Sequence, residues 1–169
     1  MRLFIAVHFS NEVKFALLSA IEELSAQAVS GNFTRPENLH LTLAFIGESE
    51  DVQTIRSVID RCVVPVFEMA ILGAGNFGKL HWVGIENNPK LKALAENIQN
   101  ELRKSGFDIE DRAFKPHITI ARKLETRSPV NLNVTRKAMS VSRISLMKSD
   151  RIDGRLTYTE VYGRDLKSN

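Results

Sequence analysis

Two short segments of the chain carry residue types that can move protons and bind an anion. Residues 39–44 read LHLTLA and residues 116–121 read PHITIA, so His40 and Thr42 match His117 and Thr119. The segments share His, Thr and Ala at the same spacing, with Leu replaced by Ile, and their histidines lie 77 residues apart. A repeat at a little under half the chain length predicts two related lobes.

The alternation of apolar and polar residues predicts that each segment is a β-strand. On a strand, residues two apart point to the same face, so His40 and Thr42 share one face and the leucines share the other. The same holds for His117 and Thr119. The aliphatic face must be buried, which turns the His/Thr face toward a cleft or solvent. Two such strands side by side would gather two imidazoles and two hydroxyls around one small volume.

This set of groups suits displacement at phosphorus. One imidazole can act as base and the other as acid, because histidine titrates near ~6.5. The two hydroxyls can donate hydrogen bonds to oxygens of a tetrahedral anion, and such chemistry requires no metal or other cofactor. A single His-x-Thr on a strand is common and usually structural, whereas two copies in aliphatic strands favour a functional interpretation.

Composition limits the class of protein. The chain has 169 residues, 43% hydrophobic and 25% charged, which suits one folded domain or two small lobes that share a core. Cys62 is the single cysteine, so an intramolecular disulfide and a Cys-based zinc site are excluded, and a cytoplasmic location is expected. A net charge of +3 is compatible with an anionic substrate and equally with an ordinary surface. No apolar stretch reaches the ~20 residues of a membrane helix.

The patterns along the chain predict α+β architecture with mostly antiparallel pairing. Ser10 is a good N-cap for the first helix, and Asp153-Gly154 is a strong signal for a two-residue hairpin turn. The glycine-rich segment 73–78 matches no phosphate-binding loop and is interpreted as a hairpin connection. Strands are expected at 2–9, 39–46, 66–72, 80–86, 117–122, 138–147 (with a strand ending near 151) and 155–163; helices are expected at 13–28, 51–62 and 89–106.

At these motifs the sequence resembles the 2H phosphoesterase superfamily, and within it the RNA 2′,3′-cyclic phosphodiesterases once called 2′-5′ RNA ligases. The matching stretches are residues 2–7 (RLFIAV), 36–47 (PENLHLTLAFIG), 77–84 (FGKLHWVG) and 114–122 (FKPHITIAR). The resemblance implies one domain over 1–169, made of two pseudo-symmetric lobes that each contribute one motif to a central cleft, with helices on the outer faces. It also implies metal-independent hydrolysis of an RNA-terminal 2′,3′-cyclic phosphate to a 2′-phosphate.

The resemblance assigns a role to each matching residue. His40 takes the place of the general acid that protonates the leaving 3′ oxygen, and His117 that of the general base, although another substrate pose would reverse them. Thr42 and Thr119 would hold the non-bridging phosphate oxygens. Arg122 stands where the family often has a phosphate-binding arginine, but strict alternation would turn it toward the aliphatic face, so the strand must end or twist there.

Other residues remain candidates for substrate contacts. Phe114 and Lys115 precede the second motif and are candidates for the rim of the site. Phe45, Phe77 and Phe114 could stack on a base, but Phe45 shares the parity of the buried leucines, so core packing is expected for it. Structural roles are expected for His8 and His81. A zinc site at the two motif histidines would need a third ligand, which no His-x-His or Glu-x-x-His element supplies.

Two other functional classes stay open from the residues. A non-catalytic module that binds RNA ends would not need both an acid and a base. A phosphodiesterase for 2′-5′ oligonucleotides or small cyclic nucleotides would keep the same catalytic residues and differ only at the rim. The expected partners are RNA ends or nucleotides that carry a 2′,3′-cyclic phosphate, and the expected form is a monomer without a membrane contact.

Overall fold

The computed structural model describes residues 1–168, so the last residue of the expected 1–169 domain lies outside the described part. Three α-helices are interspersed among nine strands within residues 1–168, and the helices lie where the apolar periodicity predicts them. The elements are β1 (Arg2–Val7), α1 (Asn11–Ser25), β2 (Ala28–Phe33), the 3₁₀ turn η1 (Pro36–Asn38), β3 (Leu41–Glu48), α2 (Val52–Arg61), β4 (Phe67–Phe77), β5 (Leu80–Ile85), α3 (Pro89–Lys104), β6 (His117–Thr126), β7 (Lys137–Val141), β8 (Arg143–Ile152) and β9 (Arg155–Asp165).

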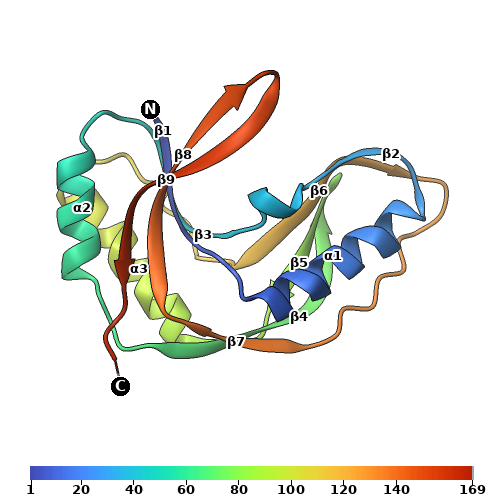
Figure 1. Cartoon of the computed structure of the whole chain (residues 1–169), viewed down its shortest axis with the longest axis horizontal. Coiled ribbons are helices and arrows are strands. Elements are labelled where there is room, and N and C mark those ends of the chain that lie inside the picture. Colours follow the sequence, from blue (N-terminus) through green and yellow to red (C-terminus); the bar gives the residue numbers. More distant parts are fainter. Residues whose placement is uncertain (169) are drawn as a thin grey trace.

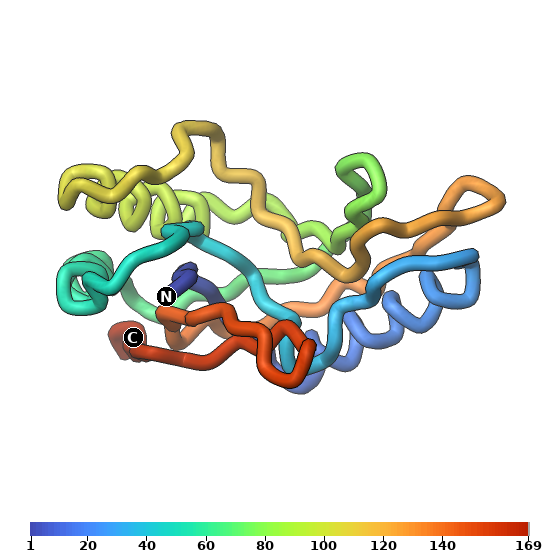
Figure 2. The backbone as a smooth tube through the Cα atoms, turned by 90° about the horizontal axis from the view of Figure 1, so that it is seen from above, coloured from blue at the N-terminus to red at the C-terminus, as the bar shows by residue number. Residues whose placement is uncertain are grey.

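The strands form two sheets, and the neighbouring strands in both sheets pair antiparallel. The first sheet has the order β3-β1-β8-β9, and the second has the order β2-β6-β5-β4-β7. Figures 1 and 2 show the two sheets as two lobes along the long axis of the molecule. The expected bilobal α+β fold with mostly antiparallel sheets is therefore confirmed.

The helices cover the outer faces of the two lobes (Figure 1). Helix α1 contacts β2, β6 and β7 of the second sheet, whereas α3 contacts β3 and α2 contacts β9 of the first. The Ser10 side chain caps α1 by accepting the Val13 N–H at 3.2 Å, as the sequence predicts. No helix within residues 1–168 combines the length and apolar composition that a membrane crossing requires.

The lobes are not simply the two halves of the chain. The first sheet contains β1 and β3 from the N-terminal half, but also β8 and β9 from the C-terminal end. The second sheet includes β2, a six-residue strand in a segment that the sequence analysis assigns to the end of a helix and a loop. None of the six residues of β2 is buried, and the strand forms through its pairing with β6, so local periodicity gives no signal for it.

Two turns place residues near the motif strands. Asp153 and Gly154 have φ values of +52° and +77°, which is the geometry expected for a two-residue hairpin turn and confirms the β8–β9 hairpin. The carbonyl oxygen of Leu156 in this hairpin accepts hydrogen bonds from the side chains of Arg35 and Asn38, immediately before the first motif. These hydrogen bonds attach the β8–β9 hairpin to the segment that immediately precedes His40.

The glycine-rich segment does connect a hairpin, but it lies mostly within β4 and not in a loop. Strand β4 continues to Phe77, and the turn falls at residues 78 and 79. Gly75 lies opposite Trp82 in the β4–β5 ladder, and a Cβ atom on Gly75 would lie 2.4 Å from the indole ring. The glycine is therefore required because the Trp82 ring lies flat on the strand at this point.

Candidate active site

The two motif strands belong to different sheets and contact each other where the lobes meet. His40 immediately precedes β3, and His117 is the first residue of β6. Strands β3 and β6 approach within contact distance although no hydrogen-bond ladder joins them. The leucine and isoleucine side chains of the motifs are fully buried, whereas both histidines and both threonines are partly accessible. We call His40, Thr42, His117 and Thr119 the histidine site.

Each motif strand has a β-bulge at the same position relative to its histidine. In β3 the ladder to β1 pairs Thr42 with Ala6 and Ala44 with Ile5, so Leu43 is the additional residue. In β6 the ladder to β5 pairs Thr119 with Trp82 and Ala121 with His81, so Ile120 is the additional residue. An additional residue reverses the alternation beyond it.

The bulges bring Phe45 and Arg122 to the face of the sheets that carries the histidine site, which we call the site face. Phe45 pairs with Phe4, and Arg122 follows Ala121 beyond the bulge of β6. The expectation that Phe45 packs in the core is wrong, because 49% of this residue is exposed. The bulge also supplies the irregularity that Arg122 needs to face the site, and a second shift near Lys123, whose φ is +53°, returns Leu124 to the core.

Each histidine is oriented by an equivalent hydrogen bond to the backbone. The Nδ1–H of His40 donates to the Asn38 carbonyl oxygen at 2.7 Å, and the Nδ1–H of His117 donates to the Lys115 carbonyl oxygen at 2.8 Å. A carbonyl oxygen only accepts, so each neutral ring carries its proton on Nδ1. The Nε2 atom of each ring is consequently free to accept a proton or, when protonated, to donate one.

Aromatic rings hold the imidazole of His40 in place. The ring of Phe4 lies 4.9 Å from the His40 ring centroid, and Tyr158 from the β8–β9 hairpin meets it edge-on at 5.1 Å. Phe4 is buried in a small apolar cluster with Ala6 and Met147, separate from the main core. This cluster lies on the site face of the first sheet and restricts how the His40 ring can turn.

A second pair of aromatic rings surrounds His117. Phe77 meets the His117 ring edge-on at 5.2 Å, and Trp82 lies 6.5 Å from it between centroids. The indole of Trp82 lies over Gly75 on the neighbouring strand. The two histidines therefore have equivalent surroundings, a backbone acceptor two residues before and two aromatic rings beside.

The charges of the site act on one another. Burial lowers the pKa of His40 below its ordinary value; the hydrogen bond to Asn38 opposes this, and the positive charges of His8, Arg122 and His117 lower it further. Burial raises the pKa of Tyr158, and the charges of Arg122 and Arg2 oppose that shift. The charge of Arg122 therefore acts on both His40 and Tyr158.

The two threonine hydroxyls, Lys115 and Phe114 differ in their exposure and in their contacts. Within residues 1–168 neither Thr42 nor Thr119 uses its hydroxyl in a hydrogen bond, which leaves both hydroxyls available to a substrate. The side chain of Lys115 is exposed, while its carbonyl orients His117. Phe114 is half-buried, and part of its ring packs against the main core.

Three rings at the site were not among the residues singled out from the sequence. Phe4 and Trp82 fall within the resembling stretches, but nothing in their spacing indicates that they flank a histidine. Tyr158 lies more than a hundred residues from His40, and only the ladder of β8 with β1 and β9 brings it there. The alternation of β9 and the hairpin turn could have predicted which face of the strand carries Tyr158, but not that its ring contacts His40.

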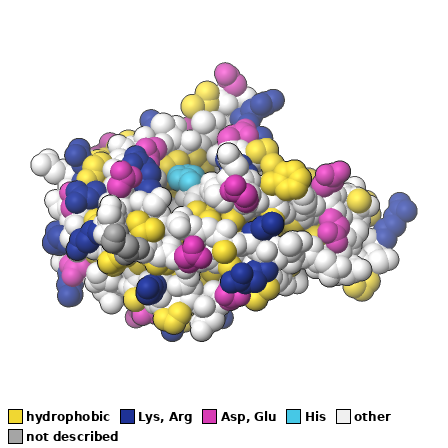
Figure 3. Space-filling view, turned by 60° about the horizontal axis from the view of Figure 1, so that its bottom comes forward, with side chains coloured by type: hydrophobic (Ala, Val, Ile, Leu, Met, Phe, Trp, Pro, Cys, Tyr) yellow, Lys and Arg dark blue, Asp and Glu magenta, His cyan; other side chains and the backbone are white. Residues whose placement is uncertain are grey.

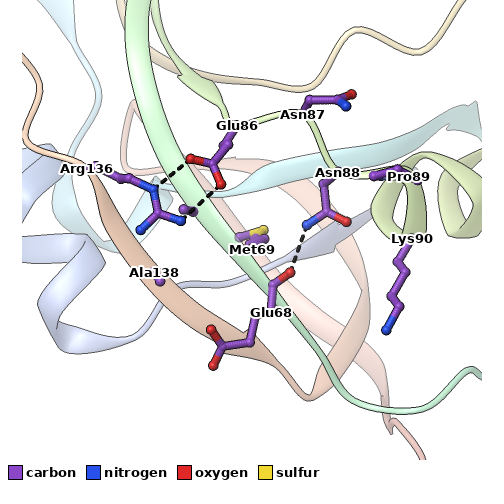
Figure 4. Close-up of a pocket in the computed structure, with 10 residues that line it drawn as sticks. Glu68, Met69, Glu86, Asn87, Asn88, Pro89, Lys90, Arg136 and Ala138 are labelled. Carbon is purple, nitrogen blue, oxygen red and sulfur yellow. Dashed lines mark hydrogen bonds and ion pairs between the residues drawn. The ribbon is translucent and has the colours of Figure 1, made fainter.

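Two hollows lie away from the histidine site. The first, about 500 Å³, is lined by residues of β4, β7 and the start of α3, and Figure 4 shows the Glu86–Arg136 ion pair and the Asn88 amide that donates to the Glu68 carbonyl there. The second, about 460 Å³, is mostly apolar and adjoins α3. Figure 3 shows basic and acidic side chains interspersed on the face turned forward there.

Among the described residues, no three His, Cys, Asp or Glu side chains are grouped to hold a metal ion.

Comparison with known proteins gives consistent matches. Residues 13–153 match the model of the 2′-5′ RNA ligase superfamily. A Thermotoga maritima protein named RNA 2′,3′-cyclic phosphodiesterase is 37% identical over 131 residues, covering 72% of this chain and 70% of that protein. An Archaeoglobus fulgidus protein of the same name is 32% identical over 150 residues, covering 84% of this chain and 83% of that protein.

Solved structures match over nearly the whole length. The Escherichia coli LigT crystal structure with 3′-AMP has a TM-score of 0.87 and 26% identity, covering 98% of this chain and 97% of that one. A crystal structure of a Thermus thermophilus protein has a TM-score of 0.89 and 25% identity, covering 99% of each chain. The paired motifs, the fold and the sequence matches agree, and the chain belongs to the 2′-5′ RNA ligase superfamily of 2H phosphoesterases.

Proposed function

We propose that this protein hydrolyses the 2′,3′-cyclic phosphate at the end of an RNA to a 2′-phosphate, without a metal ion. The observation that carries the proposal is the matched orientation of His40 and His117, each with Nδ1–H bonded to a backbone carbonyl and Nε2 free. Equivalent histidines on two contacting strands fit a reaction that needs a proton acceptor on one side and a proton donor on the other. The names of the relatives support the same reaction.

In the proposed reaction, Nε2 of His117 accepts a proton from water as the water oxygen attacks phosphorus. The bond between phosphorus and the 3′ oxygen breaks, and Nε2–H of His40 donates its proton to that oxygen. The hydroxyls of Thr42 and Thr119 donate to the non-bridging oxygens, where negative charge increases in the transition state. The guanidinium of Arg122 and the exposed ammonium of Lys115 add positive charge beside the phosphate, and the half-buried ring of Phe114 contacts the substrate at the rim of the site.

The direct test is phosphorus NMR of the product formed from RNA with a 2′,3′-cyclic phosphate end, with and without EDTA. We expect a 2′-phosphate product at a rate that the chelator leaves unchanged. A 3′-phosphate product would contradict the assigned leaving oxygen, and loss of activity with EDTA that added metal restores would contradict the metal-independent reaction. Tight binding without turnover would identify a non-catalytic RNA-end module instead.

The pH dependence tests the role of His40. As the acid, His40 must be protonated in the free enzyme, and burial lowers its pKa, so kcat/KM should fall as pH rises through a midpoint below the ordinary ~6.5. Because the charge of Arg122 contributes to the lowering, Arg122→Gln should move this midpoint to higher pH, whatever it does to the maximal rate. The measurement is kcat/KM against pH for both proteins.

Two outcomes of the pH profile would contradict this assignment. The first is an alkaline limb that keeps its position in Arg122→Gln, because the guanidinium would then not act on the titrating acid. The second is an alkaline limb that survives unchanged in a His40 variant, because another group would then be the acid.

A further inference from the structure

A second guanidinium lies on the site face, stacked on an exposed aromatic ring. The guanidinium carbon of Arg2 lies 4.9 Å from the centroid of the Phe45 ring. This is cation–π geometry, which orients the side chain while it leaves the N–H groups at its rim available. Phe45 is the ring that the bulge of β3 turns out of the core. The bulge thus creates a support for Arg2.

The strand register relates Arg2 to the histidine site. Arg2, Phe4 and Ala6 alternate along one face of β1; Ala6 lies opposite Thr42, and the Phe4 ring contacts His40. Arg2 is therefore at the far end of a row that begins at the histidine site. Four residues of a strand span about 13 Å, which places the Arg2 backbone beyond the reach of a phosphate held at Thr42.

The two lobes carry a guanidinium at equivalent places. Phe45 follows His40, and Arg122 follows His117, by the same number of residues across the same bulge. One lobe supplies the guanidinium directly as Arg122, and the other supplies it as Arg2 held on Phe45. Arg2 is in phase with Phe4 on β1, and Arg122 follows the bulge of β6, so the two guanidiniums lie on the site face of their sheets.

Within the described part of the chain, neither guanidinium is neutralised by a carboxylate. Among the ion pairs within residues 1–168, Arg136 and Arg143 have carboxylate partners, but Arg2 and Arg122 have none. Glu48, which lies opposite Arg2 in the ladder, contacts the Met1 nitrogen at 3.4 Å instead. An exposed, oriented guanidinium without a carboxylate partner suits a phosphate ligand, because its planar N–H groups match phosphate oxygens.

We propose that Arg2, held on Phe45, binds the phosphodiester on the 5′ side of the terminal nucleotide of an RNA substrate. The inference rests on the proposed function, because it assumes that the terminal cyclic phosphate lies at the histidine site beside Arg122. The RNA would then run from the reacting phosphate at Thr42 along β1, past Phe4, to Arg2. The Arg2 subsite distinguishes an RNA end from a free cyclic nucleotide, which has no such phosphodiester.

The test compares three substrates: a mononucleoside 2′,3′-cyclic phosphate, a dinucleotide with the same end, and that dinucleotide with a neutral methylphosphonate linkage. For Arg2→Gln we expect kcat/KM on the charged dinucleotide to fall about tenfold, as for the loss of a charged hydrogen bond, with little change on the mononucleotide. Arg2→Lys should restore part of the loss. Arg127→Gln, a change at another exposed arginine, is the control and should leave all three unchanged.

The methylphosphonate separates charge recognition from other roles. For wild type, replacing the charged linkage with the methylphosphonate should lower kcat/KM by the same factor as Arg2→Gln lowers it on the charged dinucleotide. For Arg2→Gln, the methylphosphonate should cause no further fall in kcat/KM. The salt dependence of dinucleotide binding should weaken in Arg2→Gln by about 0.7 in the logarithmic slope. Equal losses on the mononucleotide and dinucleotide, or a further methylphosphonate loss in Arg2→Gln, would overturn the proposal.

The failure of this inference can be distinguished from failure of the proposed function. If wild type hydrolyses none of the cyclic phosphates, the proposed function fails, and the Arg2 subsite is then read from equilibrium binding of the two dinucleotides. A charge-dependent difference in affinity that Arg2→Gln abolishes supports the subsite in that case, and its absence overturns it. An unchanged thermal unfolding midpoint in Arg2→Gln shows that the fold is retained.

Discussion

Replacing His117 or His40 with Asn is expected to lower kcat on a 2′,3′-cyclic phosphate by roughly 10²- to 10⁴-fold, because each variant loses one proton-transfer group. Asparagine is the informative substitution, since its amide N–H can keep the hydrogen bond to the Lys115 or Asn38 carbonyl that each imidazole makes. Single-turnover rates measure the effect on the chemical step. The double variant should be little worse than either single one, because the two groups act together.

A substrate with a better leaving group separates the two roles. A 4-nitrophenyl phosphodiester releases 4-nitrophenolate, which leaves without needing a proton. His40→Asn should therefore lose much less activity on this substrate, whereas His117→Asn should keep its full loss. The opposite pattern would exchange acid and base. His81→Asn is the matched control: His81 lies in β5 opposite Ala121, on the other face from Trp82, and its loss should not affect the rate. Full activity in either motif variant would refute the paired-histidine mechanism.

The second large effect is expected at the threonines. Thr42→Val and Thr119→Val keep the shape of the side chain but remove the donor, and each should lower kcat by about 10²- to 10³-fold, as for other donors to a developing oxyanion. The reason is that neither hydroxyl has another hydrogen-bond role within residues 1–168, so its whole contribution is available to the transition state. Steady-state kinetics at saturating substrate measure this loss.

Serine variants provide the control for this prediction. Thr42→Ser and Thr119→Ser retain a hydroxyl and should recover most of the rate, and Thr159→Val, on the other face of β9 from Tyr158, should be neutral. A rise in KM with kcat unchanged in the valine variants would mean that the hydroxyls bind substrate and transition state equally. If valine and serine variants are equally slow, shape and not hydrogen bonding is the cause.

Much of the fold follows from local pattern. The helices are amphipathic, and Ser10 and Pro89 mark where two of them begin. The Asp153-Gly154 turn was predictable because few residue pairs adopt two successive positive φ values. Strand β2 was not predictable, because its residues show no alternation of buried and polar positions that would distinguish it from a loop.

The sequence by itself determined which four residues could act together, since a repeated His-x-Thr in aliphatic strands fixes the face on which each pair lies. It could not determine what surrounds them, because alternation is a local rule and a single additional residue in a strand reverses it. The bulges at Leu43 and Ile120 form only when β1 and β5 pair with the motif strands, and they turn Phe45 and Arg122 outward. The contacts of Tyr158 with His40 and of Arg2 with Phe45 likewise exist only because the sheets assemble from distant segments.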